Sequence, residues 1–187
     1  MKTIGIILFV ISTFILMDCE PTIDQPFEKY TIPAGKHYST YKVELLQNDI
    51  LSFQTKFDET AEYTSKIPVN QWDTNKLFGF ADCNSFHHVH SARFGWRWLD
   101  GKIDIIAYCY VSGERIIEVI GSTQPGIVNN YEIQLLDSLY RFKFDDTVLD
   151  IQRHKPCDLG EYYLLFPYFG GDETAPHDVN IYIRRMY

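Results

Sequence analysis

The stretch SARFGWRWLDGKIDIIAYCYVSGERIIEVIGS, residues 91–122, decides how this chain folds. It holds three runs of alternating apolar and polar residues, joined by Asp100-Gly101 and Ser112-Gly113. Alternation with a period of two is typical of a strand that buries one face, and such dipeptides are typical of two-residue hairpin loops. The stretch therefore predicts three consecutive antiparallel strands, at residues 91–99, 102–111 and 114–122.

Shorter strand-like runs lie on both sides of this meander. We expect strands at residues 29–32, 41–46, 50–57, 131–136, 140–144, 147–151, 162–166 and 179–184. The region 59–83 is less regular, and we expect a long connection there with at most one helical turn. No run has the 3.6-residue period of a long amphipathic helix. Many short strands separated by turns predict an all-β fold, a two-sheet antiparallel sandwich that is jelly-roll-like.

Composition narrows the possible partners. The chain has 13 Tyr, 13 Phe and 3 Trp, which favour strands and offer flat surfaces to ligands. Its formal net charge of −8 argues against nucleic acid as a partner, because binding to a polyanion requires a basic surface. Residues 28–187 are enough for a single domain with one core.

The first residues predict export. Lys2 precedes an apolar run, Ile4–Met17, that is short for a membrane span and ends at Asp18-Cys19. We expect residues 1–18 to be a signal peptide, Cys19 to be lipidated, and residues 19–27 to be a tether from a membrane in the cell envelope. Plain secretion and an uncleaved anchor remain as alternatives.

The cysteines allow at most one disulfide once Cys19 carries a lipid. Cys109 falls on the same side of its strand as Ile103 and Ile105, so we expect a buried thiol. Cys83 and Cys157 lie in loop-like sequence and form the expected pair in an oxidising compartment. No C-x-x-C spacing is present, which disfavours a structural zinc site.

Two-residue loops fix the register of the meander, and the register separates its two faces. Arg93 is expected opposite Tyr108, Arg97 opposite Asp104, and Tyr110 opposite Arg115. One face is then a core face, interrupted only by Glu118: Ala92, Phe94, Trp96, Trp98, Ile103, Ile105, Ala107, Cys109, Ile116 and Ile120. The other is an Arg/Tyr face, made of Ser91, Arg93, Arg97, Asp104, Tyr108, Tyr110 and Arg115.

The Arg/Tyr face is the best candidate for binding a ligand. Tyrosine combines a flat apolar ring with a hydroxyl, which suits a sugar, while guanidinium groups contact carboxylate or sulfate at two points. The predicted ligand-binding residues on it are Arg93, Arg97, Tyr108, Tyr110 and Arg115. The alternative is a solvated sheet face on which Arg97 and Asp104 form an ordinary cross-strand ion pair.

Histidines give a second, weaker candidate. In an extended segment His88 and His90 point the same way, a geometry that zinc accepts. His177 or Asp172, from the long loop 166–178, is the candidate third ligand. No metal or other cofactor is required by this pattern, and His90 and His177 are also candidates for contacting a ligand on the Arg/Tyr face.

The loop 166–178 is itself a candidate binding element, because long loops in a compact domain more often bind than connect. Asp172, Glu173 and Asp178 carry oxygen ligands suited to calcium, but their spacing matches no EF-hand, so a solvated acidic turn is the expectation.

No catalytic residue can be assigned from motifs. The chain has no G-x-S-x-G elbow, H-E-x-x-H helix, phosphate loop or dinucleotide fingerprint. A glycosidase needs two carboxylates facing a cleft, which sequence alone does not place. A polysaccharide lyase needs a Tyr or His base beside a group that neutralises a uronate carboxylate, and Tyr108, Tyr110, His90 and Arg93 are of that kind.

The layout resembles exported lipoproteins of the Bacteroidota type whose single domain is a concanavalin-like jelly roll. The resemblance rests on Leu16–Cys19, on the strand 91–98 and on Tyr168-Phe169-Gly170-Gly171 before a final strand. It implies binding or cleavage of a polysaccharide. Lyases of the alginate type resemble this layout in fold, but their Lys- and Tyr-bearing final motif has no counterpart here.

Three functions follow from these patterns. The leading one is a cell-envelope lipoprotein that binds a glycan on the Arg/Tyr face. The alternatives are a carbohydrate-active enzyme, either a polysaccharide lyase or a hydrolase, and a structural or protein-interaction module without a small ligand.

Overall fold

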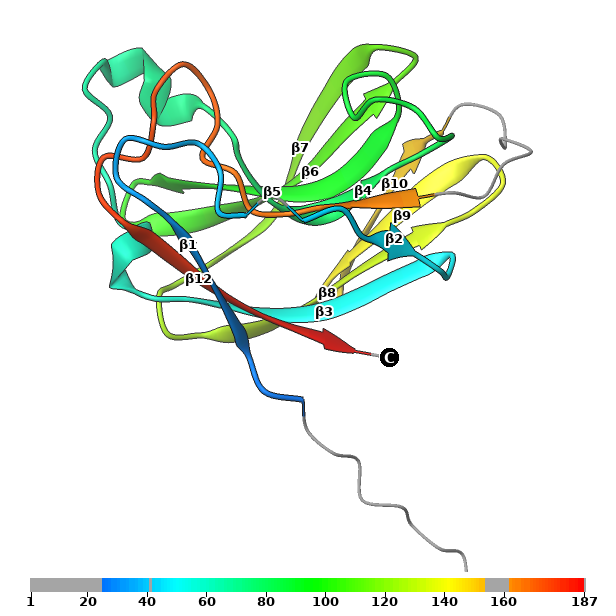
Figure 1. The fold of residues 1–187 in the computed structure, drawn as a ribbon, viewed down its shortest axis with the longest axis horizontal. Helices are drawn as coiled ribbons and strands as arrows, with labels where there is room; N and C mark the ends of the chain where they lie inside the picture. The colour runs from blue at the N-terminus through cyan, green and yellow to red at the C-terminus, as the bar shows by residue number, and fades with distance from the viewer. Residues whose placement is uncertain (1–24, 41, 154–161, 187) are drawn as a thin grey trace, which may run out of the picture.

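Two antiparallel sheets of six strands make up the fold (Figure 1). The computed structural model describes residues 25–40, 42–153 and 162–186. Sheet I runs in the order β1 (Glu28–Ile32), β12 (Val179–Met186), β3 (Ile50–Phe57), β8 (Val128–Leu135), β9 (Leu139–Phe144), β10 (Thr147–Gln152). Sheet II runs in the order β2 (Leu45–Leu46), β11 (Tyr162–Leu165), β4 (Asn75–Ala81), β5 (Ser91–Leu99), β6 (Lys102–Val111), β7 (Glu114–Thr123). The predicted jelly-roll-like all-β sandwich is confirmed.

The meander has the predicted register. Arg93 pairs with Tyr108 and Arg97 with Asp104 between β5 and β6, and Tyr110 pairs with Arg115 between β6 and β7. Both hairpin loops have positive φ at their two central residues, as a type I′ turn requires. The β6–β7 pairing has a bulge between Ile105 and Ile106. The pairs between this bulge and the hairpin loop, from Val111–Glu114 to Ile106–Val119, keep the predicted register.

The expected long connection at residues 59–83 is wrong. It contains two short 3₁₀ helices, η1 (Glu59–Ala61) and η2 (Pro68–Trp72), and then the strand β4. β4 does not alternate because all its residues except Lys76 are buried. A bulge between Lys76 and Gly79 contributes to this pattern, and Leu77 and Phe78 are both fully buried. Such a strand lacks the period of two by which strands are recognised.

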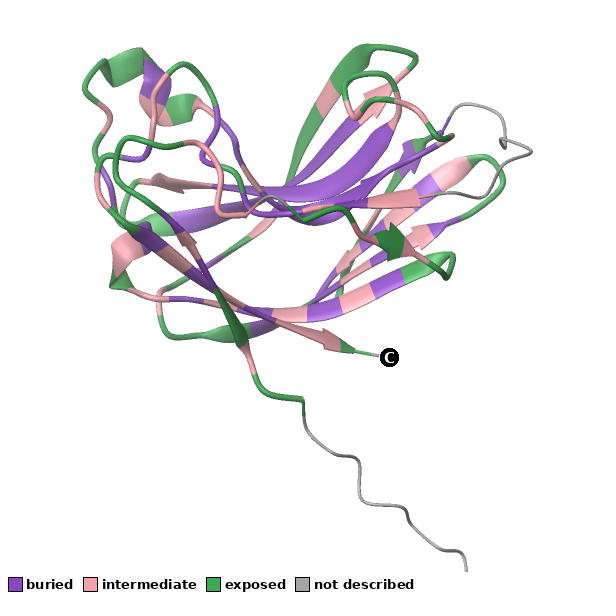
Figure 2. Ribbon diagram, viewed as in Figure 1, coloured by how far each residue is buried: buried purple, intermediate pink, exposed green. Residues whose placement is uncertain are grey.

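Aromatic side chains fill the space between the sheets. Figure 2 shows the buried residues concentrated along the strands that face this space. Phe53 and Tyr131 of sheet I stack with ring centroids 5.1 Å apart, and Phe94 of sheet II meets Tyr131 edge-on at 5.0 Å. Offset and edge-on pairs add to the free energy gained by burying the rings. The high aromatic content thus accounts for much of the core.

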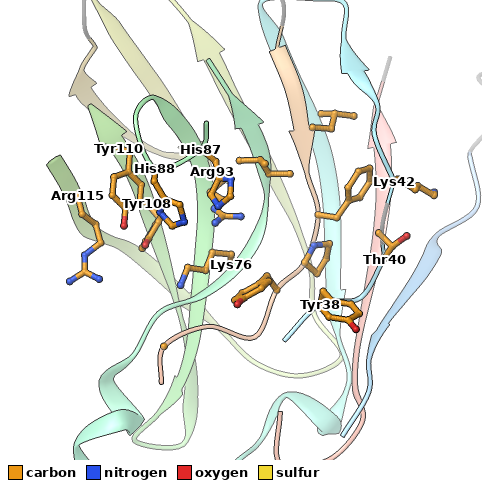
Figure 3. A pocket seen from close by; sticks show the side chains of 16 residues that line it. Tyr38, Thr40, Lys42, Lys76, His87, His88, Arg93, Tyr108, Tyr110 and Arg115 are labelled. Carbon is orange, nitrogen blue, oxygen red and sulfur yellow. The ribbon is translucent and has the colours of Figure 1, made fainter. Parts of the chain in front are cut away.

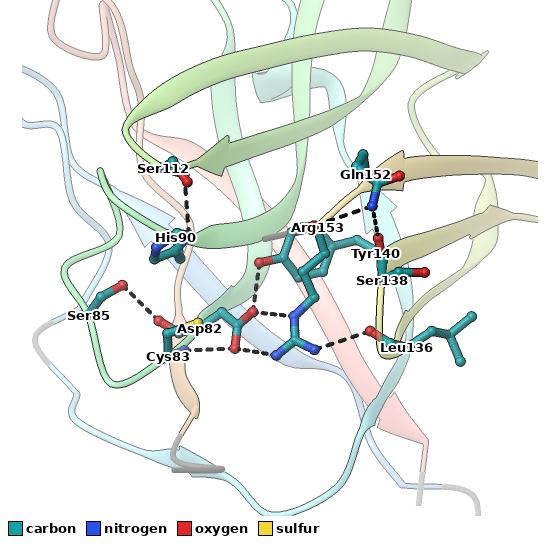
Figure 4. A network of polar contacts seen from close by, with 10 residues as sticks. All are labelled: Asp82, Cys83, Ser85, His90, Ser112, Leu136, Ser138, Tyr140, Gln152 and Arg153. Carbon is teal, nitrogen blue, oxygen red and sulfur yellow. Dashed lines mark hydrogen bonds and ion pairs between the residues drawn. The ribbon is translucent and has the colours of Figure 1, made fainter. Parts of the chain in front are cut away.

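A buried ion pair joins the two sheets at one end of the sandwich (Figure 4). Asp82 follows β4 of sheet II, and its carboxylate accepts hydrogen bonds from Arg153 Nε at 2.6 Å and Nη2 at 3.0 Å. Arg153 follows β10 of sheet I, and Tyr140 of β9 donates to the same carboxylate at 2.7 Å. Both charges are buried and fully paired, which is the condition for holding them inside a protein.

The cysteines agree with the sequence prediction as far as the described residues extend. Cys109 is a buried free thiol, and Cys83 is disulfide-bonded. Cys157, its predicted partner, lies outside the described residues, as do the predicted signal peptide, Cys19 and most of the tether. Among the described residues no helix has the length and apolar character to cross a membrane.

Candidate functional site

A cleft of about 620 Å³ lies on the outer face of sheet II (Figure 3). Its floor comes from four adjacent strands: Lys76 of β4, Arg93 of β5, Tyr108 and Tyr110 of β6, and Arg115 of β7. The remaining lining residues are Tyr38, Thr40, Lys42, His87, His88, Leu164, Leu165, Phe166, Pro167, Tyr168 and Gly171. Four of the five ligand-binding residues predicted on the Arg/Tyr face therefore meet in one cleft.

Glycines make room for the cations of the floor. Gly79 lies opposite Arg93 and Gly95 lies opposite Lys76 in the β4–β5 register. A Cβ at Gly79 would stand 2.1 Å from the Cβ of Arg93, and one at Gly170 would stand 2.3 Å from Nζ of Lys76. At Gly79 the clash would be with Cβ and Cα of Arg93 and the carbonyl oxygen of Ala92, so the missing side chain lets β4 approach β5 closely. At Gly170 the missing side chain leaves room for the end of Lys76. A Cβ at Gly95 would meet Thr74 and Asn75 instead of Lys76.

Arg93 is a buried cation that has no acidic partner in the part of the chain that the structure describes. Its side chain lines the cleft, yet the residue is only 6% exposed. The guanidinium carbon lies 5.7 Å from the centre of the Tyr108 ring, and Nε has no hydrogen-bond partner among the described residues. Burial lowers the pKa of Arg93 to about 10, so the group stays charged at neutral pH.

Lys76 brings a second positive charge to the same place. Its Nζ lies 5.0 Å from the centre of the Tyr108 ring and 5.9 Å from that of Tyr168. Burial, followed by the nearby charges of Arg93 and Arg115, lowers the pKa of Lys76 to about 8. The fold therefore holds like charges close together against their mutual repulsion.

Two tyrosine rings lie side by side at the floor of the cleft. Tyr108 and Tyr110 have ring centroids 5.8 Å apart. Burial, and then its hydrogen bond to Tyr110, raises the pKa of Tyr108 to about 12. At neutral pH Tyr108 is a neutral hydroxyl that can both donate and accept a hydrogen bond.

The expected pairing of His88 with His90 on one extended strand is wrong. Residues 86–90 form a turn, in which the Val89 amide donates to the carbonyl of Phe86 at 2.8 Å. His88 faces the cleft with its ring 5.2 Å from that of Tyr110. His90 does not line the cleft, and its Nδ1 accepts a hydrogen bond from the Ser112 amide at 3.3 Å.

His87, which the sequence did not single out, lines the cleft instead. Its ring lies 4.1 Å from that of His88. Burial, and then the charge of Arg93, lowers the pKa of His87 to about 4. The imidazole is therefore neutral at pH 7 and can accept as well as donate a hydrogen bond.

Arg97 does not belong to the cleft. Its Nε donates to Asp104 Oδ2 at 3.0 Å, and its guanidinium carbon lies 5.1 Å from the centre of the Trp72 ring. The cross-strand ion pair that stood as the alternative is the observed arrangement, and the predicted role of Arg97 in the ligand site is withdrawn.

The loop 166–178 contributes to the cleft through its first residues only. The backbone of Tyr168 forms isolated β-bridges with Lys76 and with Tyr38. Its ring stacks on that of His37, with ring centroids 5.2 Å apart. His177, predicted to contact the ligand, lies elsewhere, with Nε2 2.9 Å from the carbonyl oxygen of Thr60.

Glu173 is held through its carboxylate and Asp172 through its backbone amide. Glu173 accepts hydrogen bonds from the amides of Lys66 and Ile67, both at 2.8 Å. The amide of Asp172 donates to Asp73 Oδ2 at 3.2 Å. Among the described residues no group of three or more His, Cys, Asp or Glu side chains is placed to hold a metal ion.

Comparison with solved structures shows the same architecture in proteins of low sequence identity. The alginate lyase vAL-1 from a Chlorella virus is 12% identical with a TM-score of 0.52, over 94% of this chain and 86% of its own. A variant of alginate lyase A1-II′ is 11% identical with a TM-score of 0.51, over 86% and 79%. A GH16 protein from the mixed-linkage glucan PUL of Bacteroides ovatus, in complex with a product, is 12% identical with a TM-score of 0.52, over 87% and 82%. These likenesses establish the fold.

Comparison of the sequence with family models and with curated proteins finds no match. The chemistry of the site has to be argued from its own residues.

The cleft combines aromatic rings with cations and lacks carboxylates. None of the described residues that line it is Asp or Glu. Lys42, at its rim, is paired with Glu28 at 2.7 Å, whereas Lys76, Arg93 and Arg115 have no carboxylate partner among the described residues. Such a site is suited to a ligand that presents flat, partly apolar surfaces and groups that accept hydrogen bonds.

Proposed function

We propose that this protein binds a glycan in the cleft on the outer face of sheet II. The observation that carries the proposal is the convergence of tyrosine rings and charged donors in one cleft: Tyr38, Tyr108, Tyr110 and Tyr168 with Lys76, Arg93 and Arg115. Aromatic rings pack on the apolar faces of sugar rings, and fixed donors hold their oxygens.

Size and fold support the proposal. A cleft of about 620 Å³ is within the range of small-molecule sites and is large enough for a short stretch of a polysaccharide. The structures with the same fold include proteins named for alginate and for mixed-linkage glucan. The fold alone does not decide function, so the argument depends on the cleft.

Hydrolysis is not part of this proposal. Glycoside hydrolysis ordinarily uses a pair of carboxyl groups on either side of the scissile bond, and no carboxylate lines the cleft. β-Elimination is a second candidate, because the neutral imidazole of His87 lies near Arg93, which combines a proton acceptor with a cation for a uronate carboxylate.

A glycan array tests the binding proposal. The purified protein is applied to neutral and acidic polysaccharides, and the same polymers are assayed for unsaturated products by ultraviolet absorbance. We expect a selective hit that Tyr168→Ala and Arg115→Ala weaken, while Arg141→Ala on sheet I does not. A blank array contradicts the proposal and favours the protein-interaction module; unsaturated products add the lyase activity.

We further propose that the protein is an exported lipoprotein anchored through Cys19. The support is the sequence alone: Lys2, the apolar run Ile4–Met17 and the cysteine after it. Labelling cells with radioactive palmitate tests this. The full chain is expected to take up label and to remain with the membrane fraction, whereas Cys19→Ala takes up none; equal labelling of both would contradict lipidation at this residue.

A further inference from the structure

We infer that the ligand of this cleft is an acidic glycan, and that Arg93, Lys76 and Arg115 form a subsite for its carboxylate or sulfate groups. The inference rests on the proposed function and names the class of glycan that the cleft selects.

The first support is a contrast between two buried arginines. Arg93 and Arg153 are equally buried, each 6% exposed. Arg153 has a structural role, and Asp82 accepts hydrogen bonds from its Nε and Nη2. Arg93 has no carboxylate partner among the described residues, and its Nε is unbonded there. A buried charge without a counter-charge costs free energy, which an anionic ligand in the cleft would recover by pairing with the guanidinium group.

The second support is the distribution of charge. The chain as a whole carries a formal charge of −8, yet the cleft floor is cationic. Elsewhere in the described residues seven cations are paired with carboxylates: Lys42, Arg97, Lys102, Arg141, Lys143, Arg153 and Arg185. Lys29, Lys36, Lys56 and Lys66 are not in such pairs there, but they lie outside the cleft and none of them is buried. The three unpaired cations of the floor therefore do not follow from a general excess of positive charge.

The third support is the room that the backbone gives to these cations. Gly170 lies against the end of Lys76, where a Cβ would stand 2.3 Å from Nζ, and Gly79 lets β4 approach β5 closely at Arg93. The repulsion between Lys76 and Arg93 is then relieved when an anion binds between them. A uronate brings one carboxylate for each sugar, whereas a neutral glucan leaves all three cations without a partner.

Calorimetry with matched pairs of ligands tests the inference. The probes are oligogalacturonate, oligomannuronate and oligoguluronate, each beside its carboxyl-reduced form, and a sulfated galactan beside its desulfated form. At least one acidic probe is expected to bind about tenfold or more tightly than its neutral counterpart. Comparison of the uronate probes with the sulfated galactan shows whether the cleft binds carboxylate or sulfate groups.

Variants locate the effect within the cleft. Lys76→Met and Arg93→Met are each expected to lower affinity for the acidic probe by about tenfold or more, and Arg141→Met, which removes the same charge from sheet I, is expected to leave it unchanged. Circular dichroism checks that each variant is folded. If Arg93→Met does not fold, the measurement on Lys76→Met alone decides the test.

The outcomes separate this inference from the proposed function. If acidic and neutral members of a pair bind equally, or if Lys76→Met binds as the wild type does, the acidic subsite is wrong while glycan binding stands. If no glycan of either kind binds here or on the array, the proposed function fails, and the inference fails with it.

Discussion

Arg93 on β5 lies opposite Gly79 on β4, and a Cβ at position 79 would stand 2.1 Å from the Cβ of Arg93. It would also stand 2.3 Å from the carbonyl oxygen of Ala92. Only a residue without a side chain permits this approach of the two strands. The position of the cation at the floor of the cleft thus depends on a glycine in the neighbouring strand.

Gly79→Ala is expected to destabilise the protein and to weaken glycan binding. Overpacking of this kind costs about 1–3 kcal/mol in free energy of unfolding, and separation of β4 from β5 would displace Arg93. Urea unfolding and calorimetry measure the two effects. Arg93→Ala keeps the Cβ, the Cα and the neighbouring carbonyl oxygen that would clash, so adding it is not expected to restore stability; full restoration by that second change would show that the end of the Arg93 side chain causes the loss instead.

Asp82→Asn is expected to lower the free energy of unfolding by about 3–5 kcal/mol, because it leaves the buried Arg153 without its charge partner. Chemical denaturation measures the loss. Asp150→Asn is the matched control: it breaks the Arg141–Asp150 pair on the exposed face of sheet I, and exposed pairs contribute little. A comparable loss in both variants would contradict the role of burial.

Lys76→Met is expected to raise the melting temperature at neutral pH. The pKa of Lys76 in the folded protein, about 8, lies below its ordinary value of 10.5, so the folded state disfavours the charged form. This destabilisation is complete below about pH 8 and disappears as the pH rises toward 10.5. Thermal unfolding across that range should show the two proteins converging; a constant difference would contradict the assignment to the charge of Lys76.

Binding of the acidic ligand is expected to weaken as the pH rises through about 8, where Lys76 loses its proton. Burial lowers this pKa most, the charges of Arg93 and Arg115 lower it further, and that of Asp73 raises it. The rings of Tyr108 and Tyr168 lie beside the ammonium group. Calorimetry at a series of pH values measures the change. Lys76→Met should bind more weakly and show no such decline over the same range; a parallel decline in the variant would assign the titration to another group.

Strand register was predictable from the sequence where short turn motifs define the loops. The Asp100-Gly101 and Ser112-Gly113 loops define two-residue turns, and these fixed the pairing of Arg93 with Tyr108 and of Tyr110 with Arg115. Most of the cleft floor was predictable for that reason.

Other features could not be read because they depend on tertiary packing. β4 is buried on both faces at a bulge, so it has no alternation, and Lys76 remained unrecognised with it. The sequence predicts an extended segment at His88 and His90, but the chain turns there, which brings His87 and His88 to the cleft and leaves His90 with Ser112. The loop with Tyr168 was noticed for its length, although nothing local indicated which of its residues would face the cleft.

Nuclear magnetic resonance mapping of an acidic oligosaccharide on the labelled protein tests the position of the binding site most directly. Backbone amide shifts are expected to change most around Lys76, Arg93, Tyr108, Arg115 and Tyr168, on the outer face of sheet II. Changes centred on the outer face of sheet I, or no saturable change with any acidic oligosaccharide of the panel, would contradict binding at this site.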